Sequence, residues 1–205
     1  MAEPVHIALV DDDSAVLDSL RCYFESREIR TSCFASPETF LAAFDSDLQP
    51  DCIVSDVRLT GRSGLDLVHS LNERRSIVPI ILMTGVGDIT MAVSAMRKGA
   101  FDFIEKPFDE RHLLTVIRSA VTAKRLQSQD TAQIEELRSR FNTLSSRQRQ
   151  VMELAVAGLS NKEIASQLDI SAKTVEIHRA WVMERMDAKN LVELVRIGLK
   201  LKEGA

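Results

Sequence analysis

Five side chains in this sequence have the chemistry to bind a divalent cation and to handle a phosphoryl group. They are three carboxylates, one hydroxyl and one amine, namely Asp11, Asp12, Asp56, Thr84 and Lys106. Three carboxylates gathered in one place repel one another and require a cation. Oxygen ligands without His or Cys are those that Mg²⁺ or Mn²⁺ prefers. The residue types therefore predict a Mg²⁺ (or Mn²⁺) site, provided that the fold brings them together.

The same residues predict phosphoryl chemistry at that site. The carboxylate of Asp56 can act as a nucleophile towards phosphorus and form an aspartyl phosphate. The Thr84 hydroxyl can hydrogen-bond a phosphoryl oxygen, and the Lys106 ammonium can neutralise another. In the simpler alternative, residues 11–13 (Asp11, Asp12 and Asp13) only cap the first helix and Lys106 is a surface lysine. We favour the site because all five residues stand at the ends of apolar runs.

Apolar runs of strand length alternate with helical patterns in the first part of the chain. The runs occupy residues 5–10, 31–34, 52–56, 79–83 and 102–105. A helical pattern follows each run; Ser36 and Pro37 open the second helix, and Gly99 ends the fourth. This alternation predicts an α/β domain with a five-stranded, parallel, doubly wound sheet. Ligands of such sheets bind beyond the carboxyl ends of the strands, where the five residues fall.

The composition is that of a soluble globular protein, with 45% hydrophobic and 27% charged residues among 205. No apolar run approaches the ~18 residues of a membrane span. The first residues have no signal-peptide pattern, so we expect a cytoplasmic protein without a membrane partner. Cys22, Cys33 and Cys52 lack metal-ligand spacing and are expected to be buried, reduced thiols.

Charge is distributed unevenly along the chain. Residues 1–122 hold 12 Lys/Arg and 19 Asp/Glu, whereas residues 123–205 hold 14 and 11. An acidic first part and a mildly basic second part indicate two domains. A polyanionic partner such as double-stranded DNA is expected at the second.

The first predicted domain, residues 1–122, resembles from residue 5 onward the receiver domain of two-component response regulators, a flavodoxin-like fold. The similar segments are L-V-D-D-D, S-D-V-R, M-T-G and F-I-E-K-P-F. The resemblance implies that a sensor histidine kinase phosphorylates Asp56. It implies that the backbone carbonyl of Arg58 joins Asp11, Asp12 and Asp56 as a Mg²⁺ ligand. It also implies that Phe103 rotates inward when Thr84 closes on the phosphoryl group, and that the Lys106–Pro107 peptide bond is cis.

One residue beside the predicted site departs from the receiver pattern. Receivers usually have Pro at the second position after the segment that corresponds to S-D-V-R, and this sequence has Thr60. Because Thr leaves φ unrestrained, we hypothesise a looser loop that weakens Mg²⁺ binding or alters the lifetime of the phosphoryl group.

Residues 123–141 form a predicted linker. No Gly or Pro occurs between Pro107 and Gly158, and good helix formers dominate the segment. The last receiver helix is therefore expected to continue close to Phe141. A helix break near residues 128–131 and a flexible tether are the alternatives.

Residues 142–205 predict an all-α helix-turn-helix domain. Ser145 with Gln148, and Ser160 with Glu163, have capping-box spacing at the starts of two helices. A three-residue turn at 169–171 then leads into a longer helix over residues 174–186. The alternative is a small helical bundle that binds another protein.

The segment G-L-S-N-K-E-I-A-x-x-L-x-I-S-x-x-T-V-E-x-H-R resembles the DNA-binding domain of the NarL/FixJ (LuxR-type) family. In a helix-turn-helix, the second helix enters the major groove of DNA. Ammonium, guanidinium and hydroxyl groups suit contacts with phosphates. The residues placed for such contacts are Lys162, Ser171, Lys173, Thr174 and Arg179.

The resemblance also implies which residues face the bases. Glu176, Ile177 and Ala180 lie on the groove side; Glu176 can accept a hydrogen bond from cytosine N4, and Ile177 can contact a thymine methyl. His178 either reaches a phosphate or packs against the domain. Three further side chains of this helix are expected in the core, namely Val175, Trp181 and Val182.

Together these features predict a transcription regulator controlled by phosphorylation of Asp56. Phosphorylation would form a homodimer through the face of residues Asp88–Glu105, so that two output domains read half-sites about 34 Å apart. RNA polymerase is a further expected partner. One alternative is a regulator that uses the receiver only to dimerise. An aspartyl-phosphate phosphatase is disfavoured because Arg58 stands where its second Asp belongs.

Overall fold

The computed structural model describes residues 4–85 and 89–203. The chain divides into two compact units, residues 1–126 and residues 127–205, and each is described by itself. The first unit is an α/β domain and the second is entirely helical, as the sequence predicts.

The first unit contains the predicted parallel sheet. Its strands are β1 (His6–Val10), β2 (Arg30–Phe34), β3 (Cys52–Asp56), β4 (Ile80–Thr84) and β5 (Asp102–Glu105). They pair in the order β2-β1-β3-β4-β5, and every pair is parallel. The central strands β1, β3 and β4 are almost wholly buried because helices cover both of their faces.

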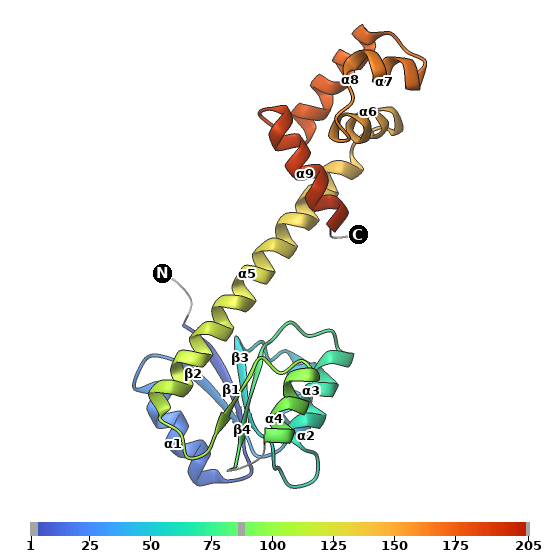
Figure 1. Cartoon of the computed structure of the whole chain (residues 1–205). Coiled ribbons are helices and arrows are strands. Elements are labelled where there is room, and N and C mark those ends of the chain that lie inside the picture. Colours follow the sequence, from blue (N-terminus) through green and yellow to red (C-terminus); the bar gives the residue numbers. More distant parts are fainter. Residues whose placement is uncertain (1–3, 86–88, 204–205) are drawn as a thin grey trace. The chain divides into compact units, whose positions relative to one another are not determined.

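Five helices cover the sheet in two layers (Figure 1). The helices α1 (Ser14–Glu25) and α5 (Glu110–Asn142) pack on one face, where Phe24 and Ile117 are fully buried. The helices α2 (Pro37–Ser46), α3 (Gly64–Glu73) and α4 (Ile89–Arg97) pack on the other, where Phe40 and Leu67 are fully buried. Ser36 accepts a hydrogen bond from the Thr39 amide as the N-cap of α2.

The helix α5 continues well beyond the part that packs on the sheet. Leu113, Ile117 and Val121 are buried against the first unit, and the boundary between the units falls after Leu126. Residues 128–131 are helical, so the predicted continuation towards Phe141 is found without a break.

Lys124 anchors α5 to the edge of the sheet at the amino ends of the strands. Its ammonium donates a hydrogen bond to the Pro50 carbonyl at 2.7 Å and lies 3.7 Å from Oδ1 of Asp51. The other carboxylate oxygen of Asp51 accepts a hydrogen bond from the His6 amide at 3.0 Å. One side chain of α5 thus binds the segment that enters β3, which in turn binds the start of β1.

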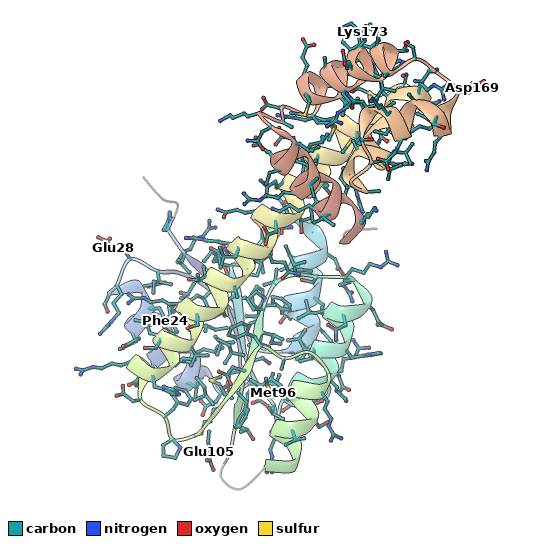
Figure 2. The ribbon with its side chains drawn as sticks, turned by 45° about the horizontal axis from the view of Figure 1, so that its top comes forward. Phe24, Glu28, Met96, Glu105, Asp169 and Lys173 are labelled. Atoms are coloured by element: carbon teal, nitrogen blue, oxygen red, sulfur yellow. The ribbon has the colours of Figure 1, made fainter. Side chains whose placement is uncertain are left out.

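The second unit contains α6 (Ser146–Val156), α7 (Asn161–Leu168), α8 (Ala172–Arg185) and α9 (Leu191–Glu203). Both predicted capping boxes are present, at the starts of α6 and α7. Asp169 ends α7 in a left-handed conformation (φ 52°), and Ser171 caps α8. The turn between α7 and α8 is the predicted one, and Asp169 projects from it (Figure 2).

The cysteines differ in part from the expectation of three buried thiols. Cys52 is buried, and burial raises the pKa of its thiol to about 12. Cys33 is half-buried, and Cys22 is exposed because it lies on the outer side of α1. All three are free thiols. Across the described residues, no helix has both the length and the apolar character of a membrane span.

Candidate functional site

The order of the strands brings the predicted site residues to one edge of the sheet. Asp11 directly follows β1, Asp56 ends β3, Thr84 ends β4 and Lys106 directly follows β5. Because β1, β3, β4 and β5 are consecutive parallel neighbours, their carboxyl ends lie side by side. The topology alone therefore gathers residues that are up to 95 positions apart in the chain.

The three acidic residues form a cluster that fits a metal ion. Asp11, Asp12 and Asp56 each offer a carboxylate oxygen, and these oxygens lie within 4.8 Å of one another. Asp11 is buried, Asp56 is half-buried and Asp12 is exposed, so the cluster is anchored in the sheet and open to solvent on one side. An all-oxygen donor set of this kind suits Mg²⁺ or Mn²⁺.

Lys106 connects two of these carboxylates. Its ammonium nitrogen lies 3.0 Å from Oδ2 of Asp11, to which it donates a hydrogen bond, and 3.5 Å from Oδ2 of Asp56. Its backbone amide donates to the Thr84 carbonyl at 2.7 Å, which continues the pairing of β4 with β5. The following peptide bond, Lys106–Pro107, is cis as expected.

Opposing electrostatic effects act on the Asp56 carboxylate. Burial raises the pKa of this carboxyl above its ordinary value, and the neighbouring Asp11 adds to the rise, whereas the Lys106 ammonium opposes it. One oxygen, Oδ1, accepts a hydrogen bond from the Val57 amide at 2.9 Å. A bound cation would relieve the repulsion and favour the ionised, nucleophilic form.

Asp12 is stabilised by a residue that the sequence does not point to as its partner. Its Oδ2 accepts two hydrogen bonds from Thr60, one from the hydroxyl at 2.5 Å and one from the backbone amide at 3.0 Å. These bonds hold the pKa of Asp12 below its ordinary value. The hypothesis of a looser loop supposes that a loop without Pro at this position is less restrained. The two hydrogen bonds from Thr60 instead attach this loop to Asp12.

The alternative that the acidic run only caps a helix applies to one residue. Asp13 is the N-cap of α1 and accepts a hydrogen bond from the Ala15 amide at 2.9 Å. Asp11 accepts from the Asp13 amide, and Asp12 accepts from Thr60. Asp11 and Asp12 thus face the site while Asp13 caps the helix.

Gly64 allows the first turn of α3 to approach the site closely. A Cβ at this position would lie 2.4 Å from the Asp56 carbonyl oxygen, closer than real contacts allow, and 3.1 Å from the Val57 Cα, which is a tight contact. The Gly64 amide donates to the Val57 carbonyl at 3.0 Å. The loop that carries Arg58 and Thr60 is therefore closed at its base by a residue that must lack a side chain.

The predicted switch residues lie on neighbouring strands. Thr84 is buried at 4% exposure, and its hydroxyl donates to the Gly85 carbonyl at 3.4 Å. Phe103, on β5, is 40% exposed. In the predicted dimer face, Val93 and Met96 of α4 are also exposed, and Asp88 lies outside the described residues. Figure 2 labels Met96 on α4 and Glu105 at the end of β5.

The start of α8 presents polar groups to solvent. Lys173 projects from the first turn (Figure 2), where it forms an ion pair with Glu176 at 2.9 Å. Ser171 and Thr174 share a hydrogen bond of 2.8 Å between their hydroxyls. Arg179 donates to the Asn161 side chain at 2.7 Å, which ties α8 to the start of α7. Lys162 lies beside Asn161 in the first turn of α7.

The apolar residues of α8 divide differently from the prediction. Val175 and Val182 are buried as expected, but Trp181 is 46% exposed, so its assignment to the core is wrong. The buried positions, Val175, Val182 and Met186, recur with helical spacing, and residue 181 lies off that stripe. Trp181 instead contacts His178 edge to face, with ring centroids 5.6 Å apart. The Nδ1 atom of His178 is buried without a hydrogen-bond partner in the described structure.

Ile177 and Trp181 thus form an exposed apolar pair on the outer side of α8, with 44% of Ile177 accessible. Ala180 is exposed beside them, as is Glu176. The exposed side of α8 therefore contains the three residues that the resemblance places in the groove, together with the mispredicted Trp181.

Comparison with protein families gives two matches that together span most of the chain. Residues 7–118 match the response regulator receiver domain, and residues 142–197 match the luxR family of bacterial regulatory proteins.

Several known proteins are similar to this chain over nearly its full length. The transcriptional regulatory protein FixJ of Bradyrhizobium diazoefficiens is 42% identical over 95% of both chains. The response regulator protein TmoT of Ectopseudomonas mendocina is 41% identical over 96% of this chain and 89% of its own. Among solved structures, the response regulator StyR superposes with a TM-score of 0.82 at 34% identity, covering 97% of this chain and 100% of its own. Full-length FixJ from B. japonicum superposes with a TM-score of 0.62 at 40% identity, over 99% of both.

Proposed function

Because the chain belongs to the two-component response regulators that join a receiver to a LuxR-type DNA-binding domain, we propose that phosphorylation of Asp56 controls its binding to DNA. A sensor histidine kinase would supply the phosphoryl group. The observation that carries this proposal is the cluster of Asp11, Asp12 and Asp56 with Lys106 3.5 Å from the Asp56 carboxylate.

Each residue of the cluster has a distinct part in phosphoryl transfer. Asp11, Asp12, Asp56 and the Arg58 backbone carbonyl would hold Mg²⁺ (or Mn²⁺), which neutralises phosphoryl oxygens when bound. A carboxylate oxygen of Asp56 attacks phosphorus as the bond from phosphorus to the kinase histidine nitrogen breaks. The Lys106 ammonium, already near Oδ2 of Asp56, would donate a hydrogen bond to a phosphoryl oxygen.

The phosphoryl group would then bias a two-state receiver. It adds roughly 1.5–2 negative charges at neutral pH. The Thr84 hydroxyl, which makes a long hydrogen bond of 3.4 Å to the Gly85 carbonyl, is a ready donor to a phosphoryl oxygen. Movement of Thr84 towards the site would leave space for Phe103 to turn inward from its exposed position.

The domain limits proposed are residues 1–122 for the receiver, 123–141 for the linker and 142–205 for the DNA-binding domain. The receiver would dimerise through the face of residues Asp88–Glu105, where Val93, Met96 and Phe103 are exposed. A dimer presents two copies of α8 to half-sites about one turn of DNA apart, roughly 34 Å.

Contacts with DNA would divide between phosphates and bases. The groups suited to phosphates are Lys162, Ser171, Lys173, Thr174 and Arg179, with His178 beside them. Glu176, Ile177 and Ala180 would face base edges. A protein that binds DNA would act in the cytoplasm, and RNA polymerase would be the machinery that such a regulator of transcription acts on.

Light scattering after size exclusion tests the proposal. Wild-type protein is compared with Asp56→Asn, each with and without acetyl phosphate and Mg²⁺, while phosphorylation is followed by retarded gel migration. We expect phosphorylated wild type to double in mass and Asp56→Asn to stay unmodified and monomeric.

Three results would contradict parts of this proposal. Phosphorylation without a change in mass at micromolar protein would exclude dimerisation as the output step. DNA binding by Asp56→Ala equal to that of phosphorylated wild type would favour a receiver that serves only for dimerisation. Sustained turnover of a generic aryl phosphate would instead indicate a phosphatase.

A further inference from the structure

We propose that Thr60 is a positioning residue that holds Asp12 in the geometry of a metal ligand. The inference rests on the proposed function, because it assumes that the acidic cluster binds Mg²⁺. It assigns a role to the residue that occupies the place where receivers usually have Pro.

The contact between Thr60 and Asp12 is bidentate and joins two loops. The hydroxyl and the backbone amide of Thr60 both donate to Oδ2 of Asp12, at 2.5 and 3.0 Å. The two residues are 48 positions apart, in the loops that follow β1 and β3. Two donors on one oxygen fix the carboxylate more firmly than one, because rotation of the side chain breaks both bonds.

Asp12 is the member of the cluster that most needs such a partner. Asp11 is buried and held by the Lys106 ammonium and the Asp13 amide. Asp56 is half-buried and held by the Val57 amide, with Lys106 nearby. Asp12 is exposed, and its carboxylate is held by the hydroxyl and the amide of Thr60. Without Thr60, its side chain would be free to turn towards solvent.

The bonds from Thr60 leave Asp12 able to bind a cation. A carboxylate offers about four lone-pair positions, and Thr60 occupies two of them on one oxygen. The oxygens of Asp11, Asp12 and Asp56 lie within 4.8 Å of one another while both bonds from Thr60 are made. The cluster and the contact with Thr60 are thus present at the same time. Thr60 therefore orients Asp12 and does not compete with a cation for it.

The contact also fixes the loop that carries another proposed ligand. Arg58, whose backbone carbonyl is the fourth proposed ligand, lies between Asp56 and Thr60 in the sequence. Gly64 closes the base of this loop, and Thr60 ties its middle to the loop after β1. A Pro at position 60 would supply neither an N–H nor a hydroxyl to Asp12.

Calorimetric titration of Mg²⁺ into full-length protein tests this role. Thr60→Val keeps the amide and the branched shape but removes the hydroxyl, so we expect Mg²⁺ to bind about three- to tenfold more weakly. Thr60→Ser keeps both donors and should restore the wild-type affinity within about twofold. Thr60→Pro removes both donors and should bind more weakly than Thr60→Val.

Two further variants show whether the effect acts through Asp12. Ser63→Ala removes the N-cap of α3 from the same loop without touching Asp12, and should keep the wild-type affinity. In an Asp12→Asn background, Thr60→Val should have no further effect, because the ligand that it positions is already lost. Equal losses in Ser63→Ala and Thr60→Val, or additive losses in the double variant, would overturn the proposal.

The outcomes separate this inference from the proposed function. Wild-type protein that fails to bind Mg²⁺, or Asp12→Asn that binds it normally, would show that the cluster is not the metal site. If wild type binds and Asp12→Asn is impaired, an unchanged or tighter affinity in Thr60→Val would overturn the positioning role alone.

Discussion

The ammonium nitrogen of Lys106 lies 3.0 Å from Oδ2 of Asp11, although 95 positions separate the two residues in the chain. The contact spans the carboxyl edge of the sheet from the loop after β5 to the loop after β1. The same ammonium is 3.5 Å from the Asp56 carboxylate, so one cation partly neutralises two of the three acids. Lys106 therefore neutralises these acids in the metal-free protein, and we propose that it neutralises a phosphoryl oxygen after phosphorylation.

Lys106→Met is expected to strengthen Mg²⁺ binding while it impairs phosphorylation. Removal of the ammonium leaves the carboxylates without their neighbouring positive charge. A bound Mg²⁺ then relieves more repulsion among the carboxylates and binds more tightly. At the 3.0–3.5 Å separations seen here, one charge is worth roughly 1 kcal/mol in water, or about fivefold in affinity. Calorimetry measures the affinity, and modification by acetyl phosphate measures the loss of acceptance. Lys98→Met, which removes an exposed lysine directly after α4, controls for net charge. Equal affinities in the two variants would contradict this prediction.

Gly64→Ala is expected to destabilise the receiver and to disturb the phosphorylation site. The added methyl group would lie 2.4 Å from the Asp56 carbonyl oxygen, which is backbone and cannot turn aside. Overpacking of this kind costs roughly 1–3 kcal/mol. Thermal unfolding gives the loss of stability, and the rate of modification by acetyl phosphate gives the loss of function. Gly85→Ala is the matched control, because a Cβ there meets nothing within 4 Å.

Receiver stability is expected to fall as the pH drops below 6.5. Burial lowers the pKa of His6 from 6.5, and the charges of Arg30 and Lys124 lower it further against the opposing effect of Asp51. Between the lowered value and 6.5, the unfolded chain binds more protons than the folded one. The free energy of unfolding therefore rises with pH in this range. The contribution of neutral His6 to stability is fully present above pH 6.5 and is lost as the pH falls towards the lowered pKa.

His6→Gln should remove this part of the pH dependence, whereas His112→Gln, a change at an exposed residue of α5, should retain it. Unfolding is followed in the full chain at pH values on both sides of 6.5, and the receiver transition is identified by its shift with Mg²⁺. A pH profile of His6→Gln that matches wild type would exclude His6 as the source.

Lys162→Ala and Ile177→Ala are expected to weaken DNA binding in different ways. Loss of a phosphate contact at Lys162 lowers affinity for all sequences and reduces the salt slope by about 1. Loss of a base contact at Ile177 relaxes sequence preference and leaves the salt slope unchanged. Trp181, the only tryptophan and 46% exposed on the same helix, gives a fluorescence readout of binding. A change of preference in Lys162→Ala would contradict the assignment.

The fold and the membership of the acidic cluster follow from the sequence because they depend on local patterns. Four of the five apolar runs end at a residue with side-chain chemistry, and parallel strands place such ends together. The N-caps Ser36, Ser145 and Ser160 are equally readable, because a cap needs only its own first turn.

Contacts that depend on the conformation of loops, or on which side of a helix packs against the domain, could not be predicted from the sequence. Nothing local to Thr60 indicates that it binds Asp12, because the contact depends on the path of two loops. The close approach of Gly64 to Asp56 is equally invisible, although a glycine at a helix start is a hint. Trp181 was assigned to the core by its apolar character, whereas the spacing of Val175, Val182 and Met186 would have excluded it.

The contacts of Lys124 have a practical consequence for the design of truncated fragments of this protein. The receiver match stops at residue 118, yet Lys124 holds the Pro50 carbonyl and lies near Asp51. A recombinant fragment ending at residue 118 or 122 would lose this clasp, while one ending at Leu126 would keep it. A receiver truncated at residue 118 or 122 would thus be less stable than the receiver within the full chain. Ligand affinities measured on it would be altered by that loss of stability.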